Sequence, residues 1–102
     1  MGDLFEVARA SELESGQGML VEADGKEIAL FNCEGKYYAI DNDCTHVGGP
    51  LCDGEVCGTT VTCPWHGAEF DLKSGHALAP PAEKDINTYN VHVDGDIIKI
   101  EI

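Results

Sequence analysis

Basic residues are scarce in this chain of 102 residues. Six Lys and Arg stand against 19 Asp and Glu, which gives a formal net charge of −13. Such a surface repels phosphate groups, so the composition argues against nucleic acids and anionic membrane surfaces as partners. Acidity of this degree keeps a small protein soluble, and it can also steer docking to basic patches on other proteins.

Long apolar segments are also lacking. No segment approaches the roughly 20 apolar residues of a membrane span. The first residues, MGDLFE, lack the basic start and apolar core of a secretory signal, so we expect a cytoplasmic protein with no membrane contact. The five cysteines are an odd number, and in a reducing compartment this favours metal ligands or free thiols over a complete disulfide framework.

Long helical periodicity is missing as well, and short alternating segments with turn pairs between them predict an all-β chain. The length suits one domain over residues 1–102. Residues 19–40 predict a three-stranded meander with turns at Asp24-Gly25 and Glu34-Gly35, and residues 89–102 predict a hairpin with a turn at Asp94-Gly95. One helical turn, capped by Ser11, is expected at residues 10–15. Ala79-Pro80-Pro81-Ala82 predicts a rigid connector that cannot be a central strand. The remaining expected strands are 4–7, 55–56, 59–62 and 68–72.

Residues 41–67 differ from the rest, because they are rich in loop residues and hold four of the five cysteines and two of the four histidines. They contain Cys44-Thr45-His46 and Cys63-Pro64-Trp65-His66, with sixteen residues between His46 and Cys63. Two thiolates and two imidazoles can hold a tetrahedral zinc ion or complete a [2Fe–2S] cluster. Zinc modules usually pair Cys with Cys and His with His. Mixed halves favour the diiron cluster, and a structural zinc module for protein interaction stays as an alternative.

Cys44-x-His46 followed by Cys63-x-x-His66 resembles the Rieske [2Fe–2S] motif. The flanking segments Val47–Pro50, Gly67–Asp71 and Pro80–Ala82 resemble the rest of the first cluster loop, the strand leaving the second loop and the family's proline loop. The resemblance implies a Rieske-like fold of antiparallel β-sheets, with a two-loop cluster-binding subdomain over about residues 41–82. It further implies that Cys44 and Cys63 bind the inner iron, and that His46 and His66 bind the outer iron.

The departures from high-potential Rieske proteins indicate a low reduction potential. Those proteins carry a disulfide between the two loops at the positions of Gly49 and Trp65, and Ser and Tyr hydroxyls at the positions of Ala68 and Phe70. Without such donors the reduced state is less stabilised, and the potential is expected near the low end of the Rieske range, roughly −150 mV. Four carboxylates would act in the same direction if they lie near the cluster: Asp41, Asp43, Glu69 and Asp71.

A short, acidic, disulfide-free Rieske chain resembles the ferredoxin component of bacterial aromatic-ring-hydroxylating dioxygenase systems. This implies a monomeric electron carrier of aromatic hydrocarbon catabolism rather than an enzyme. Its partners would be an NADH-dependent flavin reductase that supplies electrons and a terminal oxygenase that receives them one at a time. The alternatives are a Rieske-type small subunit of assimilatory nitrite reductase, a supplier of electrons to a diiron monooxygenase or cytochrome P450, and a redox sensor, which would need a response element that the chain lacks.

The other cysteines and histidines have simpler interpretations. Cys33 is expected to pack as a small apolar side chain in the core. Cys52 and Cys57 are close in sequence and could pair, but free thiols are expected in a reducing compartment. His76 follows a turn and His92 lies on the polar side of a predicted strand, so both are expected on the surface.

Overall fold

The computed structural model describes residues 3–42, 51–64, 67–79 and 85–102. Within these ranges the chain forms ten strands and two short 3₁₀ turns, and none of its helical segments is long and apolar enough to cross a membrane. The prediction of an all-β chain is confirmed. The elements are β1 (Leu4–Arg9), η1 (Ala10–Glu12), β2 (Gly18–Ala23), β3 (Lys26–Cys33), β4 (Lys36–Asp41), η2 (Leu51–Asp53), β5 (Glu55–Cys57), β6 (Thr60–Thr62), β7 (Glu69–Asp71), β8 (Ala77–Ala79), β9 (Thr88–Asp94) and β10 (Ile97–Glu101).

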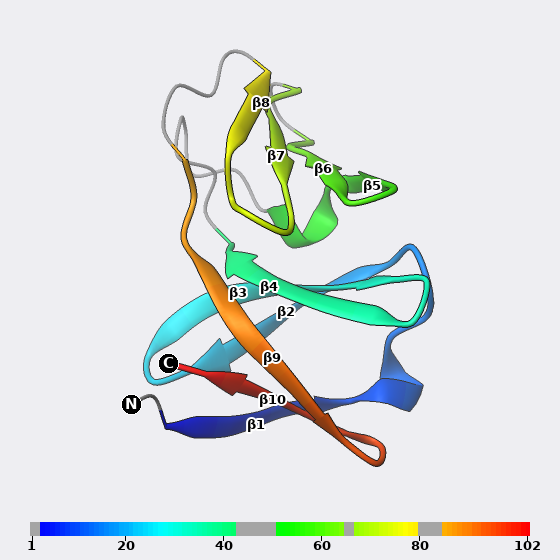
Figure 1. Ribbon diagram of the computed structural model, residues 1–102, viewed down its shortest axis with the longest axis vertical. Coiled ribbons are helices and arrows are strands. Elements are labelled where there is room, and N and C mark those ends of the chain that lie inside the picture. Colours follow the sequence, from blue (N-terminus) through cyan, green and yellow to red (C-terminus); the bar gives the residue numbers. More distant parts are fainter. Residues whose placement is uncertain (1–2, 43–50, 65–66, 80–84) are drawn as a thin grey trace.

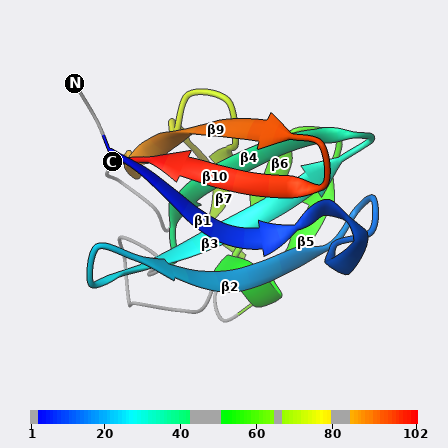
Figure 2. The same cartoon turned by 90° about the horizontal axis from the view of Figure 1, so that it is seen from below.

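Six strands form a large antiparallel sheet in the order β1-β10-β9-β4-β3-β2. The sheet curls so that its two outer strands, β1 and β2, contact each other (Figure 2). The predicted meander over residues 19–40 is confirmed as β2, β3 and β4. Its two tight turns place Asp24 and Gly25 at φ 52° and 74°, and Glu34 and Gly35 at φ 53° and 89°. Hairpin turns of two residues with positive φ at both positions match the right-handed twist of the flanking strands.

The turn of the last hairpin differs from its prediction by one residue. Asp94 pairs with Ile97, so the turn residues are Gly95, at φ 62°, and Asp96. The Asp96 carboxylate accepts hydrogen bonds from the Ser11 backbone N–H at 3.0 Å and from the Ser11 hydroxyl at 3.2 Å. The prediction of Ser11 as a helix cap is therefore wrong, since its hydroxyl fastens η1 to this distant turn, and the helical turn is also shorter than expected.

Four short strands form a second antiparallel sheet, in the order β5-β6-β7-β8. It lies over one face of the large sheet, next to β4 and the start of β9 (Figure 1). β8 was not predicted, because Ala77-Leu78-Ala79 has no polar–apolar alternation to mark a strand. β8 lies at the edge of this sheet, as expected for a strand that precedes two prolines. Pro80, Pro81 and Ala82 themselves lie outside the described residues.

Strand β3 is buried on both faces and separates two hydrophobic cores. Ile28 and Leu30 point into the barrel core, the interior of the curled large sheet, whereas Ala29 and Phe31 point into the intersheet core, beneath the small sheet. The barrel core consists of Leu13, Val21, Ala23, Ile28, Leu30, Ala39, Ile98 and Ile100. The intersheet core consists of Ala29, Phe31, Cys33, Ile40, Leu51, Val61, Cys63, Ala68, Phe70, Leu72 and Ile86.

Replacing Phe31 tests the coupling of the two sheets through β3. The Phe31 side chain is 0% exposed, and F31A should lower the free energy of unfolding by about 3–5 kcal/mol because it leaves a cavity. At roughly 4–8 °C per kcal/mol, the thermal midpoint should fall by at least about 12 °C. Circular dichroism measures this midpoint.

L20A is the matched control, because Leu20 is 49% exposed on the neighbouring strand β2. It should change the free energy of unfolding by less than about 0.5 kcal/mol. Equal losses in F31A and L20A would contradict the assignment of the intersheet core.

Candidate functional site

Cys63 is the one predicted cluster ligand that lies within the described residues. It directly follows β6, and the residue is 1% exposed. Its backbone N–H donates to the Ala68 carbonyl at 2.7 Å, and its carbonyl accepts from the Gly67 N–H at 3.1 Å. Gly67 has a φ of +72°, a conformation that favours glycine. The backbone therefore holds this thiol at the closed base of the β6–β7 loop.

The other three predicted ligands lie outside the described ranges, as do several residues that flank them. These are the ligands Cys44, His46 and His66, together with Asp43, Val47, Gly48, Gly49, Pro50 and Trp65. Their assignment stays a prediction from the sequence. Among the residues that the structure describes, no group of three or more His, Cys, Asp or Glu side chains could hold a metal ion.

Ala68 and Phe70 surround the Cys63 region with apolar surface. Both residues are 0% exposed and belong to the same intersheet core as Cys63. Neither side chain carries a hydrogen-bond donor, so this part of the site offers no side-chain donor to stabilise added negative charge. Ala68 and Phe70, the two positions at which high-potential proteins carry hydroxyls, are thus buried in the same core as the predicted ligand Cys63.

Buried Asn42 joins the two ends of the segment that carries Cys44 and His46. Its side chain is enclosed, with the residue 4% exposed, at the point where the chain leaves β4. The Asn42 carbonyl accepts from the Leu51 N–H at 2.8 Å, and Asn42 Oδ1 accepts from the Cys52 N–H at 2.9 Å. Residues on either side of the interval 43–50 are therefore tied directly to each other. The sequence does not indicate this role of Asn42, because an Asn after a strand is most often a turn residue on the surface.

The other cysteines that the structure describes, Cys33, Cys52 and Cys57, form no disulfide with one another. Cys33 is buried in the intersheet core, as predicted, and burial, together with the neighbouring Glu34 carboxylate, raises the pKa of its thiol. Cys52 is half-buried and Cys57 is exposed, and both are free thiols as expected. Burial and then the adjacent Asp53 carboxylate raise the pKa of Cys52. The raised pKa values keep the Cys33 and Cys52 thiols protonated, which disfavours metal binding and nucleophilic reactions at these two residues.

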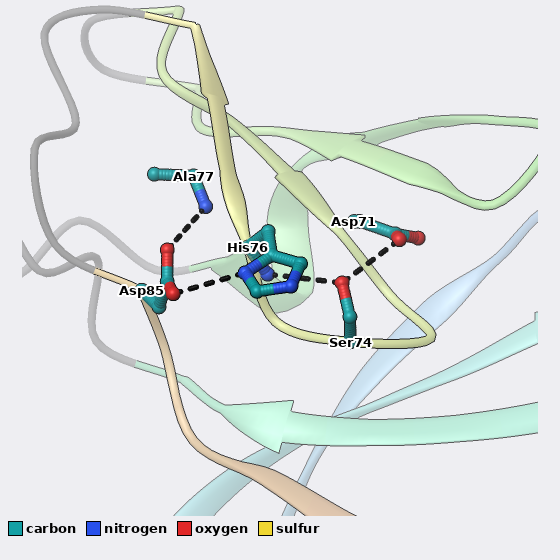
Figure 3. A network of polar contacts seen from close by, with 5 residues as sticks. All are labelled: Asp71, Ser74, His76, Ala77 and Asp85. Atoms are coloured by element: carbon teal, nitrogen blue, oxygen red, sulfur yellow. Dashed lines mark hydrogen bonds and ion pairs between the residues drawn. The ribbon is translucent and has the colours of Figure 1, made fainter.

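His76 and His92 are surface residues, as expected, with side chains 67% and 50% exposed. Each contacts a carboxylate: His76 Nδ1 lies 3.0 Å from Asp85 Oδ2, and His92 Nε2 lies 2.9 Å from Glu101 Oε1. Figure 3 shows that Asp85 also accepts from the Ala77 backbone N–H, at 2.9 Å. This backbone contact, followed by the one to His76, lowers the pKa of the Asp85 carboxyl group.

Two of the four carboxylates predicted to act on the potential accept hydrogen bonds, Asp71 from its own turn and Asp41 from a distant segment. Asp71 accepts from the Lys73 backbone N–H at 3.1 Å. It also accepts from the Ser74 hydroxyl at 2.9 Å, as Figure 3 shows. Asp41 accepts from Tyr89 and Asn87. Both carboxylates therefore hold the backbone in place, a role that the sequence did not indicate. Their effect on a potential stays a prediction.

The family comparison is specific along most of the chain. A sequence model described as the Rieske [2Fe-2S] domain matches residues 3–90. The chain is 38% identical over 91 residues to the ferredoxin component of a naphthalene 1,2-dioxygenase system of Pseudomonas aeruginosa, which covers 89% of this chain and 88% of that protein. It is also 38% identical over 93 residues to a 3-phenylpropionate/cinnamic acid dioxygenase ferredoxin subunit of Shigella flexneri, with 90% and 87% covered.

Solved structures agree with the relatives. The ferredoxin of carbazole 1,9a-dioxygenase from Nocardioides aromaticivorans superposes with a TM-score of 0.91 at 29% identity, and 95% of each chain is covered. An NADH-dependent nitrite reductase small subunit from Mycobacterium tuberculosis has a TM-score of 0.89 at 23% identity, with 100% of this chain and 96% of that chain covered. At 23% identity, the likeness to the nitrite reductase subunit shows a shared fold and nothing more.

Replacing Asn42 tests its role at the base of the 43–50 interval. N42A leaves the Cys52 N–H without its acceptor and should cost about 1–3 kcal/mol of folding free energy, because this hydrogen bond is partly buried. The thermal midpoint should fall by at least about 4 °C, and amide hydrogen exchange should accelerate in a peptide that spans residues 51–53. N90A is the control, since Asn90 is exposed on β9. If amide hydrogen exchange over residues 51–53 is unchanged in N42A, Asn42 does not hold the base of this interval.

Proposed function

Because the chain belongs to the Rieske [2Fe-2S] domain family, we propose that it serves as the ferredoxin of an aromatic-ring-hydroxylating dioxygenase system. The observation that carries the proposal is its match, over nearly the full length of both chains, to ferredoxin components of such systems. Those relatives are the electron carriers of their systems and not the catalytic oxygenases. The chain therefore acts as one carrier domain and not as an enzyme.

The donor set fits the cluster that this family carries. A Rieske [2Fe–2S] cluster supplies one-electron transfer when bound, and it requires two thiolates and two imidazoles. Cys44 and Cys63 would provide the thiolates, and His46 and His66 the imidazoles. The position of Cys63 supports this role, because its thiol is buried, forms no disulfide with another described cysteine, and lies at a loop base closed by two backbone hydrogen bonds.

Apolar residues beside Cys63 support a low potential. Reduction adds one negative charge, and hydrogen bonds to the cluster sulfurs stabilise that charge and raise the potential. Ala68 and Phe70 are buried in the same core as Cys63 and can donate nothing from their side chains. The reduced form is consequently a strong donor, which suits delivery of electrons to another Rieske centre of higher potential.

The partners follow from the role and from the charge. A terminal oxygenase would receive the electrons, since the relatives are components of dioxygenase systems. A flavin-dependent reductase that oxidises NADH would supply them. With a net charge of −13, the chain would dock as a monomer against basic patches on both partners in the cytoplasm, and this attraction should weaken with salt.

The nitrite reductase alternative has weaker support. Proteins of that description share the fold with this chain but only 23% of its sequence in the superposed example. The relatives that match at 38% identity are ferredoxin components. A structural zinc site would use the same four ligands. Metal analysis of the purified protein distinguishes it from an iron–sulfur cluster.

A redox titration monitored by absorbance and EPR tests the proposal directly. Anaerobically purified protein should contain two iron atoms per chain and show a Rieske-type EPR signal on one-electron reduction, with a midpoint of roughly −150 mV. A strongly positive midpoint would contradict the argument from Ala68 and Phe70. Colourless protein that contains zinc and no iron would rule out electron transfer.

Introducing hydroxyls beside Cys63 tests the cause of the low potential. A hydrogen bond to a charged group contributes about 1.5–3 kcal/mol, and 59 mV corresponds to about 1.4 kcal/mol for one electron. A68S and F70Y should therefore each raise the midpoint by roughly 60–130 mV. F5Y is the control, because Phe5 on β1 packs against the barrel core, and it should leave the midpoint unchanged.

A further inference from the structure

The two halves of the predicted ligand set leave from different sheets. Cys63 directly follows β6 of the small sheet, whereas Cys44 comes three residues after Asp41, the last residue of β4 in the large sheet. No strand pair joins the two sheets within the described residues. The separation of the two thiol ligands must therefore depend on other contacts between the sheets.

Residues 85–89, which we call the strap, connect the two sheets. The first half of the strap holds the β7–β8 hairpin of the small sheet. The Ile86 N–H donates to the Gly75 carbonyl at 2.8 Å, and the Asp85 carboxylate accepts from Ala77 and His76 (Figure 3). The Ile86 side chain is buried in the intersheet core, with the residue 5% exposed.

The second half of the strap holds the end of β4. The Asn87 side-chain amide donates to Asp41 Oδ2 at 3.0 Å, and the Asp41 N–H donates to the Asn87 carbonyl at 3.1 Å. The Tyr89 hydroxyl donates to Asp41 Oδ1. Burial, and then the Asp41 carboxylate, raise the pKa of Tyr89 well above its ordinary value, so the hydroxyl keeps the proton that it donates. In Figure 1 the strap is the orange segment that rises from β9 towards the small sheet.

At each end of the strap, the contact that holds it most strongly is a buried or partly buried one. The His76–Asp85 pair is exposed to solvent and contributes little. At the small sheet, the Gly75–Ile86 contact is tight: Gly75 is buried at φ +77°, and a Cβ there would lie 2.1 Å from the Ile86 carbonyl oxygen. At the large sheet, the corresponding contact is the partly buried hydrogen bond between Tyr89 and Asp41.

We propose that the strap, held by Gly75 at one end and by Asp41 and Tyr89 at the other, is a positioning element that sets the separation between the Cys44–His46 and Cys63–His66 halves. The proposal rests on the proposed cluster-binding function. Because one half of the strap bonds to the β7–β8 hairpin and the other half to the end of β4, the strap transmits position only while both of its ends are held. Loss of either end should therefore have nearly the same effect as loss of both.

The test compares G75A, Y89F and the double variant G75A/Y89F in holoprotein of measured iron content. G58A is the control for G75A, because Gly58 also has positive φ (+63°) and a Cβ there would meet nothing within 4 Å. Y37F is the control for Y89F, because Tyr37 lies half-buried on β4 and its hydroxyl has no hydrogen bond to any described residue. The readouts are the EPR g values of the reduced protein and the rate at which a chelator removes iron.

We expect G75A and Y89F each to shift the g values and to speed iron loss about two- to tenfold, the range that corresponds to one net hydrogen bond. G75A/Y89F should lose iron no faster than the faster single variant, since residues that act through one element are not additive. Both controls should match the wild type. If G75A does not fold, I86A replaces it, because the Ile86 side chain is the buried group at the same end of the strap.

Two results would overturn the proposal. One is wild-type g values in fully loaded G75A and Y89F. The other is a double variant whose rate increase is the product of the two single increases, because that would describe two independent structural contacts. Wild-type protein without iron would instead refute the proposed function, so the two failures are distinguishable.

Discussion

Burial of both faces of β3 is the constraint on which the rest of the structure depends. One face of this strand closes the curled large sheet, and the other supports the small sheet through Ala29 and Phe31. A chain of this length can bury only a modest apolar area. Sharing one strand between two cores lets the small sheet, whose strands have three residues each, be stabilised by packing that its own hydrogen bonds could not provide.

The predicted ligand segments begin and end at positions that hydrogen bonds hold. Asn42 ties together the residues on either side of the interval 43–50, and Cys63 bonds to Ala68 and Gly67 across the base of its loop. A site formed from loops is precise only when its supporting residues are themselves fixed. In this chain the supports are polar groups, some of them buried, whose hydrogen bonds are satisfied, and no buried side-chain N or O atom among the described residues lacks a partner.

Charge is distributed in a way that suits a transient electron carrier. Apolar residues surround Cys63, while the many carboxylates lie on the surface or hold turns, as Asp71 and Asp96 do. Acidic surface accelerates association with basic partners without requiring a large permanent interface. The proposed low potential and the acidic surface have separate causes. The potential depends on the absence of side-chain donors near Cys63, and the acidic surface on the excess of Asp and Glu.

Much of the protein could be predicted from local patterns. Alternation and paired turn residues identified the β2–β4 meander and the last hairpin, because backbone conformation at Asp24-Gly25 and Glu34-Gly35 is decided by the residues themselves. The mixed Cys and His spacing favoured the diiron cluster over zinc, and the resemblance of this motif and its flanks to the Rieske motif indicated the family. Ala68 and Phe70 could be recognised as residues without donors, since a side chain's chemistry does not depend on the fold.

Tertiary structure decided the features that depend on distant neighbours. β8 has no pattern of its own and exists because β7 pairs with it, and Ser11 bonds to Asp96 across 85 positions of sequence rather than capping a helix. Asn42, Asp41, Gly75 and Tyr89 carry no motif, and their roles arise from contacts between segments that only folding brings together. Short segments of sequence therefore determine which residues can act as ligands. Their relative placement depends on long-range packing, because a contact between two distant segments leaves no pattern in either segment alone.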